Sequence, residues 1–305
     1  MYPVRYPSES LFLDVQGLKL HLRHWPRPNK PKLLLLHGWM DASASFQFLV
    51  DSLPPEWDIY ALDWRGFGLS DHQAYGYYDR NHMLLDLHYV RQHLCPNDEP
   101  IHVVGHSLGG MLASMYAGAL PETFKTLTVA EGFGVPNGDL NKAHIRLRHY
   151  IEEHATLQPY PAPTTLAELA QKQRQRNPLL SEDQALFVAE ALAHVDADGQ
   201  LVYRADKKHK HTTPTPYYYD YAKAVWRLIS CPTLLLHGDT VAHNHYLNAI
   251  KDTLSERMAC YPQAQIHKFS GVGHMLQWEA PQAFADALAA FLRQHETAPA
   301  ATPLA

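Results

Sequence analysis

The chain has 305 residues, of which 46% are hydrophobic and 19% charged, a balance typical of a soluble globular protein. This length is enough for one large domain or for a domain that carries a sizeable insertion. The formal net charge of −5 gives no reason to expect nucleic acid as a partner, and no apolar run is long enough to span a bilayer.

Unbroken aliphatic runs are the main secondary-structure signal along the chain. They predict eight strands, in order FLDV and LKLHLRHW joined at Gly17, KLLLLHG (32–38), DIYALDW (58–64), IHVVGHS (101–107), TLTVAEG (126–132), TLLLHGD (233–239) and QIHKFSG (265–271). Helical patterns alternate with these strands, at 80–94, 108–120, 244–258 and 280–294. Strands without polar alternation are covered on both faces, so we expect a doubly wound, mostly parallel eight-stranded α/β sheet that begins with an antiparallel hairpin.

The alternation stops between residues 136 and 228. This segment contains amphipathic helical patterns at 166–176 and 182–195, and two stretches rich in proline and aromatic residues, QPYPAPTT and TPTPYYYDY. A structureless loop of this length is improbable inside a domain. We therefore predict a helical cap (lid) over 136–228, an α/β core formed by 1–135 and 229–296, and a flexible tail at 297–305.

The stretch VVGHSLGG places Ser107 in a G-x-S-x-G pattern between an apolar strand and a helix. This is the context of a nucleophile elbow, in which a strained turn presents the serine hydroxyl at the carboxyl edge of the sheet. His274 lies in SGVGHMLQWEAP, between the last strand and the last helix, and follows the serine in chain order. A neutral imidazole there can take the proton of the serine and return it, so we predict Ser107 as nucleophile and His274 as general base.

Four motifs together resemble the α/β-hydrolase fold superfamily over essentially the whole chain. They are LLLHGWMDASASF, DWRGFGLSD, GHSLGG and GVGHMLQWEAPQAFADAL. The opening HGWxDxxxSF is most similar to that of the serine-hydrolase-like proteins, whereas the haloalkane dehalogenases carry an aspartate at the position of Ser107. The resemblance implies an oxyanion hole formed by the backbone N–H groups of Trp39 and Leu108.

The acidic member of the triad is the open question. In most of the superfamily the acid lies three residues after the glycine that ends the strand TLLLHG, and this chain has Val241 there. Two carboxylates remain as candidates: Glu131, directly after the strand that follows the nucleophile's helix, and Asp239, directly after Gly238. Some members of the superfamily use the earlier strand end. We therefore predict Glu131 as the acid and keep Asp239 as the alternative.

These residues predict a serine hydrolase that cleaves a small-to-medium carboxylic ester through an acyl-enzyme. The alternatives are a carbon–carbon bond, thioester or lactone hydrolase on the same scaffold, or a non-catalytic binding protein with this fold. The scattered histidines lack a zinc-like spacing, so we expect neither a metal nor a cofactor. Three cysteines without a CxxC pattern, and a start without secretory character, lead us to expect a cytoplasmic protein.

Overall fold

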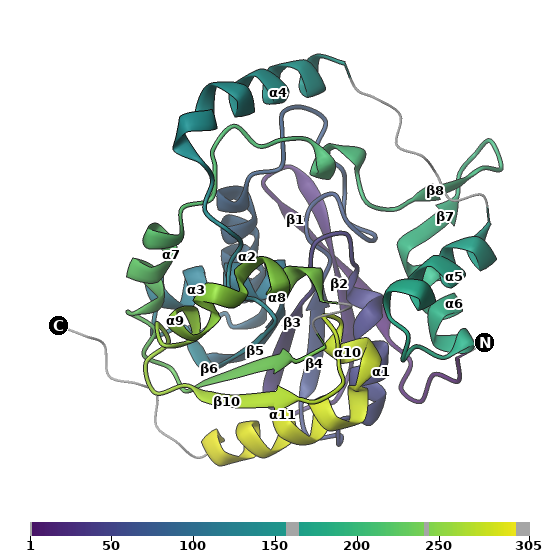
Figure 1. Ribbon diagram of the computed structural model, residues 1–305. Helices are drawn as coiled ribbons and strands as arrows, with labels where there is room; N and C mark the ends of the chain where they lie inside the picture. The colour runs from purple at the N-terminus through teal and green to yellow at the C-terminus, as the bar shows by residue number, and fades with distance from the viewer. Residues whose placement is uncertain (1, 157–164, 241–243, 297–305) are drawn as a thin grey trace.

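The computed structural model describes residues 2–156, 165–240 and 244–296, and its centre is one twisted sheet with helices on both faces (Figure 1). The strands are β1 Glu9–Val15, β2 Leu18–Trp25, β3 Lys32–Leu36, β4 Asp58–Leu62, β5 Ile101–His106, β6 Phe124–Ala130, β9 Thr233–Gly238 and β10 Gln265–Phe269. Their order across the sheet is β1-β2-β4-β3-β5-β6-β9-β10. The pairs β1–β2 and β2–β4 are antiparallel and the others are parallel, which confirms the expected sheet.

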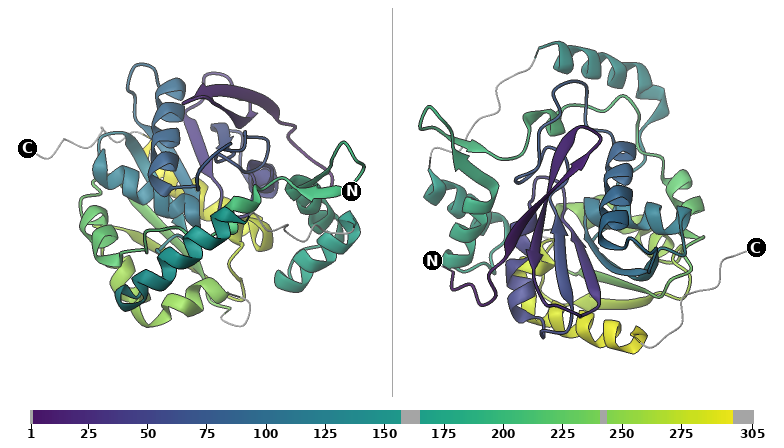
Figure 2. Two further views of the ribbon diagram at one scale, coloured as in Figure 1. Left: turned by 90° about the horizontal axis from the view of Figure 1, so that it is seen from above. Right: turned by 180° about the vertical axis from the view of Figure 1, so that it is seen from behind.

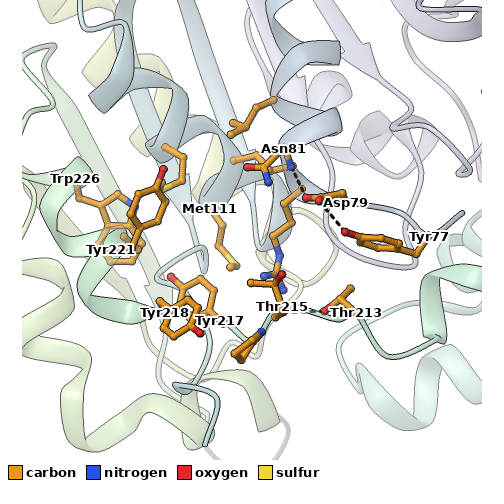
Figure 3. A pocket seen from close by; sticks show the side chains of 16 residues that line it. Tyr77, Asp79, Asn81, Met111, Thr213, Thr215, Tyr217, Tyr218, Tyr221 and Trp226 are labelled. Atoms are coloured by element: carbon orange, nitrogen blue, oxygen red, sulfur yellow. Dashed lines mark hydrogen bonds between the residues drawn. The ribbon is translucent and has the colours of Figure 1, made fainter. Parts of the chain in front are cut away.

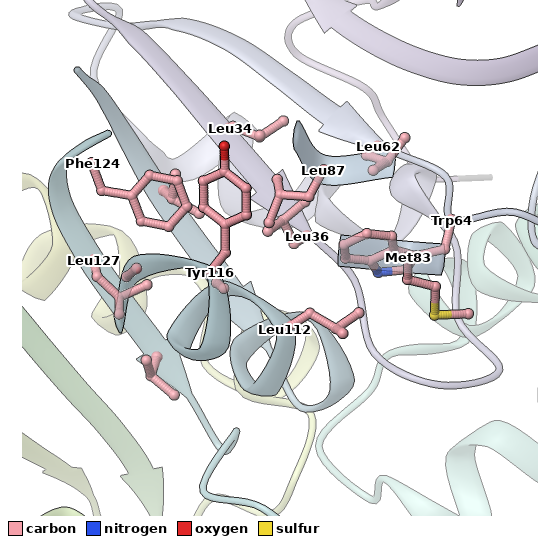
Figure 4. Close-up of a cluster of buried hydrophobic side chains, with 14 of the residues drawn as sticks. Leu34, Leu36, Leu62, Trp64, Met83, Leu87, Leu112, Tyr116, Phe124 and Leu127 are labelled. Carbon is pink, nitrogen blue, oxygen red and sulfur yellow. The ribbon is translucent and has the colours of Figure 1, made fainter. Parts of the chain in front are cut away.

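Successive side chains of β3 show why the aliphatic runs form central strands. Leu34 and Leu36 enter the hydrophobic cluster on one face of the sheet, and Leu33 and Leu35 enter the cluster on the other. Because neighbouring side chains of a strand point to opposite faces, a strand covered on both sides needs an apolar residue at every position. Figure 4 shows the first cluster, where Leu34 and Leu36 lie with Tyr116 of helix α3 (Leu108–Ala119).

Core helices cover both faces of the sheet. The face that receives Leu34 is covered by α2 (Arg80–Leu94) and α3 (Leu108–Ala119), and the other by α1 (Gln47–Ser52) and α11 (Pro281–His295). The short helices η1 (Ser43–Phe46), α1 and α10 (Leu276–Glu279) have no counterpart in the sequence prediction. The helix expected at 244–258 is divided into α8 (His245–Ile250), η5 (Lys251–Thr253) and α9 (Leu254–Met258).

The segment between β6 and β9 is mainly helical. It contains η2 Leu140–Lys142, α4 Ala143–Ala155, α5 Leu166–Arg176, α6 Glu182–Leu192, β7 Ala193–Val195, β8 Leu201–Tyr203, η3 Lys207–Lys210 and α7 Tyr219–Trp226. The helix expected at 182–195 ends at Leu192, because its last three residues pair with β8 in a hairpin. In Figures 1 and 2, α4 lies at the opposite end of the molecule from α11.

The last helix of this segment, α7, packs on the core helix α3. The approach is close enough that a Cβ on Gly118 of α3 would collide with the carbonyl oxygen of Val225. Trp226 is fully buried and belongs to the same hydrophobic cluster as the α3 side chains. The stretch QPYPAPTT falls almost wholly outside the described residues, as does the tail at 297–305.

Candidate active site

Ser107 lies on the sharp turn between β5 and α3. Its backbone has φ 51° and ψ −116°, a combination that costs energy for any residue with a side chain and marks functional sites. The turn is held by a hydrogen bond from the Ser107 N–H to the Ala130 carbonyl at 2.8 Å. It also depends on Gly109, because a Cβ there would collide with the backbone of Leu36 in β3. The sequence pattern thus forms the strained turn expected of an elbow.

His274 lies in the loop between β10 and α10. The Nε2 atom of His106 lies 2.9 Å from the carbonyl oxygen of His274, and the Nδ1 atom of His106 lies 3.2 Å from the side-chain amide of Gln277. An amide donor on Nδ1 places the proton of His106 on Nε2, which then donates to His274. Both partners are buried, so they hold the His274 loop in place. The sequence motifs predicted a role for neither His106 nor Gln277. His106 occupies the variable position before the serine in the G-x-S-x-G motif.

Glu131 directly follows the last residue of β6, and its side chain is completely buried. Its carboxylate accepts hydrogen bonds from the Gly238 N–H at 2.6 Å and from the Asn244 side-chain amide at 2.9 Å. The Nδ1 atom of His274 lies 3.2 Å from the same carboxylate. The structure therefore brings the preferred acid candidate into contact with the predicted base. Asn244 was not predicted: it caps α8 by accepting from the Leu247 N–H, and no sequence motif marks its second role.

Asp239 lies in a different environment. Its carboxylate accepts from the Gly271 N–H at 2.8 Å and forms an ion pair with Lys268 at 3.1 Å. These contacts join the loop after β9 to the end of β10, and in the part of the chain that the structure describes they do not include His274. Val241, the position where most of the superfamily carries the acid, lies outside the described residues.

Burial determines the protonation of the Glu131–His274 pair. It raises the pKa of Glu131 to about 8, against the lowering effect of the hydrogen bonds from Asn244 and Gly238. Burial also lowers the pKa of His274 to about 4. The low dielectric of the protein interior disfavours the charged form of each group.

Two stretches of backbone lie next to Ser107. Leu108 is the first residue of α3, and N–H groups in the first turn of a helix have no partner within the helix. On the other side, a Cβ built on Gly38 would lie only 3.1 Å from the Ser107 Cβ, so the backbone entering Trp39 passes directly beside the serine. The Trp39 side chain is half-exposed, and its indole N–H donates to the His209 carbonyl at 3.2 Å.

A cavity of about 550 Å³ opens over this rim of the sheet. Ser107, His274, Trp39 and Leu108 all line it. Its outer wall comes from the segment between β6 and β9, with Arg146 of α4 and with His209, His211, Thr212 and Thr213. The space is of the size that holds a small-molecule ligand.

A second cavity of about 310 Å³ adjoins the first and shares Arg80, Met111 and Thr213 with it (Figure 3). Its wall includes four of the five aromatic residues that the sequence places close together near residue 220, namely Tyr217, Tyr218, Tyr221 and Trp226. The fifth, Tyr219, is buried in the core with Trp226. The aromatic group therefore contributes both to a cavity wall and to the hydrophobic core.

Comparisons with known proteins agree with the fold. The family model described as alpha/beta hydrolase fold matches residues 31–281. The chain belongs to the α/β-hydrolase family. This α/β hydrolase is 26% identical to the serine hydrolase-like protein of Danio rerio over 209 residues, 67% of this chain and 63% of the relative. It is 29% identical to the human serine hydrolase-like protein over 177 residues, 56% of this chain and 86% of the relative.

Solved structures show the same fold. The thioesterase domain from the curacin biosynthetic pathway superposes with a TM-score of 0.82 at 24% identity, covering 93% of this chain and 99% of that domain. This α/β hydrolase spans slightly less than two thirds of the length of its Danio rerio relative, whereas it covers the solved thioesterase domain almost completely. None of the helices in the described ranges is both long and apolar enough to cross a membrane.

Proposed function

We propose that this α/β hydrolase is a serine hydrolase that cleaves a small-to-medium carboxylic ester through an acyl-enzyme. The observation that carries the proposal is the 3.2 Å contact between His274 and the buried Glu131, with Ser107 and His274 lining one cavity. A buried carboxylate that holds an imidazole beside an elbow serine is the arrangement that activates a hydroxyl nucleophile.

In the proposed first step, the Ser107 hydroxyl attacks the ester carbonyl and its proton passes to His274. The negative charge that develops on the carbonyl oxygen is stabilised by the backbone N–H groups of Trp39 and Leu108. Glu131 holds the imidazole in the tautomer that accepts this proton and offsets the positive charge of the imidazolium. The alcohol leaves with the proton from His274.

In the second step, water replaces the alcohol. His274 takes a proton from the water, which attacks the acyl-enzyme, and Ser107 leaves with that proton as the carboxylic acid is released. All groups that the two steps need come from the chain itself and from water. We propose residues 136–228 as a cap over the cavity, with α7 anchoring it to the core, and a cytoplasmic location in keeping with three free, buried cysteines.

The test is active-site labelling followed by kinetics. A fluorophosphonate should modify the wild-type protein at Ser107, as located by peptide mass spectrometry, and Ser107→Ala should abolish both labelling and ester hydrolysis while leaving the thermal unfolding transition in place. The loss of turnover should be on the order of 10⁴-fold or more. Near-parental hydrolysis by the alanine variant would overturn the proposal.

A panel of p-nitrophenyl esters, thioesters and lactones of matched chain length then separates ester cleavage from the related reactions. A folded wild-type protein that neither reacts with the fluorophosphonate nor hydrolyses any member of the panel would indicate a binding protein with a hydrolase fold.

A further inference from the structure

The charged residues that line the cavity with Ser107 and His274 are two arginines, Arg80 and Arg146. In the residues that the structure describes, neither aspartate nor glutamate lines this cavity. Other titratable groups on its wall add no negative charge at neutral pH. Burial lowers the pKa of His209 to about 3, so its ring is neutral, and Tyr78 and Tyr246 have raised pKa values.

Arg80 is the first residue of α2, an exposed residue whose pKa the negative charge of the neighbouring Asp79 raises. Its guanidinium lies 5.5 Å from the centre of the Tyr217 ring, and within the described ranges it takes part in no hydrogen bond or ion pair. The neighbouring carboxylate of Asp79 accepts instead from the Asn81 N–H at 2.8 Å and from the Tyr77 hydroxyl at 3.2 Å (Figure 3). The donors of Arg80 are therefore free for a ligand.

Arg146 reaches the same cavity from α4. Its guanidinium donates to the carbonyl oxygen of Thr213 at 3.1 Å, a neutral acceptor that leaves its charge uncompensated. Desolvation lowers the pKa of Arg80; the charges of Tyr217 and Asp79 act against this lowering, and the positive charge of Arg146 acts with it, so the two guanidinium groups repel one another. Arginine stays protonated in proteins, so an anion that enters the cavity between the two guanidinium groups is attracted to both.

We propose that the substrate carries, besides the ester, an anionic oxygen group (a carboxylate or a phosphate) that Arg80 and Arg146 bind. A planar guanidinium binds either group through two parallel hydrogen bonds. The adjoining cavity lined by Leu84, Met111 and Met115 then receives the apolar part of the same molecule. This inference rests on the proposed function for the ester, but the anion site itself is defined by residues outside the Ser107–His274–Glu131 group.

Hydrolysis provides the first test. The p-nitrophenyl half-ester of suberic acid carries a free carboxylate, and its methyl ester is a neutral substrate of nearly the same shape. The wild-type protein should have a kcat/KM for the anionic ester about 10- to 100-fold above that for the neutral ester, because charge-assisted hydrogen bonds contribute this much. The ratio should fall as salt is added.

Arg80→Gln and Arg146→Gln should each reduce this ratio by about tenfold or more. Arg148→Gln is the matched control, since Arg148 is an exposed residue of the same helix as Arg146 and lines neither cavity; its ratio should equal that of the wild type. Equal turnover of the two esters, unchanged by Arg80→Gln, would overturn the anion site and leave the esterase proposal intact.

Binding provides a second test that needs no turnover. Calorimetric titration of the Ser107→Ala protein with suberate and with octyl phosphate should show binding of at least one ligand, and the one that binds more tightly identifies the anionic group. Adding Arg80→Gln should abolish this binding, and adding Arg148→Gln should not. Binding without any ester hydrolysis by the wild type would refute the esterase and retain the anion site, whereas the absence of binding by both ligands would refute the anion site.

Discussion

Glu131 positions its carboxylate from a backbone conformation that a glutamate seldom adopts, with φ 55°. The turn immediately after β6 directs the side chain toward the neighbouring strand end, where the Gly238 N–H, Asn244 and His274 meet it. A buried carboxylate with no donor would be costly, and here three donors surround it. Glu131 is therefore placed to orient an imidazole, which is the role that we propose for it.

Neutralising the two candidate acids separately tests this role. Glu131→Gln should lower kcat by on the order of 10⁴-fold, because the amide loses the charge that stabilises the imidazolium and presents an N–H group to one of the two donors, Gly238 or Asn244, that now meet a carboxylate oxygen. Asp239→Asn should change kcat by less than roughly tenfold, since an exposed ion pair contributes little. Circular dichroism and thermal unfolding of both variants control for folding. Abolished turnover in Asp239→Asn, with Glu131→Gln near the parental rate, would assign the acid to Asp239.

The pH profile gives an independent view of the same pair. The active form needs a neutral His274 and an ionised Glu131, and burial raises the pKa of Glu131 to about 8. For a neutral ester, kcat/KM should therefore increase with pH through the neutral range and level off above pH 8. In Glu131→Gln the remaining acid limb should shift below the ordinary histidine value of 6.5, toward the pKa of about 4 that burial gives His274. Identical midpoints for the two proteins would show that Glu131 and His274 do not titrate together.

Among the elements, the parallel strands bring distant parts of the chain to one rim. The carboxyl ends of β5 and β6 are adjacent and carry Ser107 and Glu131, and the end of β9 supplies the Gly238 N–H. Strand direction therefore assembles residues that lie far apart in the chain, such as His274 and Glu131, which are separated by 143 positions. Ligand sites of open α/β sheets are expected at such an edge.

The close contact between α3 and α7 predicts that a methyl group added at Gly118 destabilises the protein. In an unobstructed helix, replacing Gly118 by alanine would stabilise the protein by up to about 1 kcal/mol through backbone entropy. Here the added methyl group collides with the Val225 carbonyl, so Gly118→Ala should instead lower the free energy of unfolding by about 1–3 kcal/mol. Urea unfolding measures the change, and a stabilised variant would mean that α7 does not pack this closely on α3.

At the scale of the whole molecule, two aromatic residues of α7 line the second cavity but differ in burial, so their substitution should affect substrate preference and stability differently. Tyr221 is 66% exposed and lines the second cavity, so Tyr221→Ala should change the preference among esters of graded chain length with little loss of stability. Trp226 also lines this cavity but is fully buried, so Trp226→Ala should cost about 3–5 kcal/mol of stability. An unaltered chain-length preference in Tyr221→Ala would exclude the second cavity from substrate binding.

The sequence by itself was sufficient for the sheet and for the elbow. Aliphatic runs such as KLLLL are covered on both faces, so a central strand is the structure that they favour. The glycines around Ser107 allow the close backbone contacts that a tight strand–helix turn requires. Local patterns determine such features, because the physical constraint acts between neighbours in the chain. The short helices at Ser43–Ser52, the division of 244–258 and the β7–β8 hairpin lacked a local signal of this strength.

The partners of the site depended on packing between distant segments. Whether Glu131 or Asp239 faces His274 is decided by side-chain directions at two strand ends, and Asp239 turns instead to Gly271 and Lys268. The contact of Asn244 with Glu131, and the position of Arg80 and Arg146 on the cavity wall, follow only from the placement of α8, α2 and α4 around the rim. Hydrogen bonds and cavity charges are properties of groups that meet in space, so a spacing along the chain does not specify them.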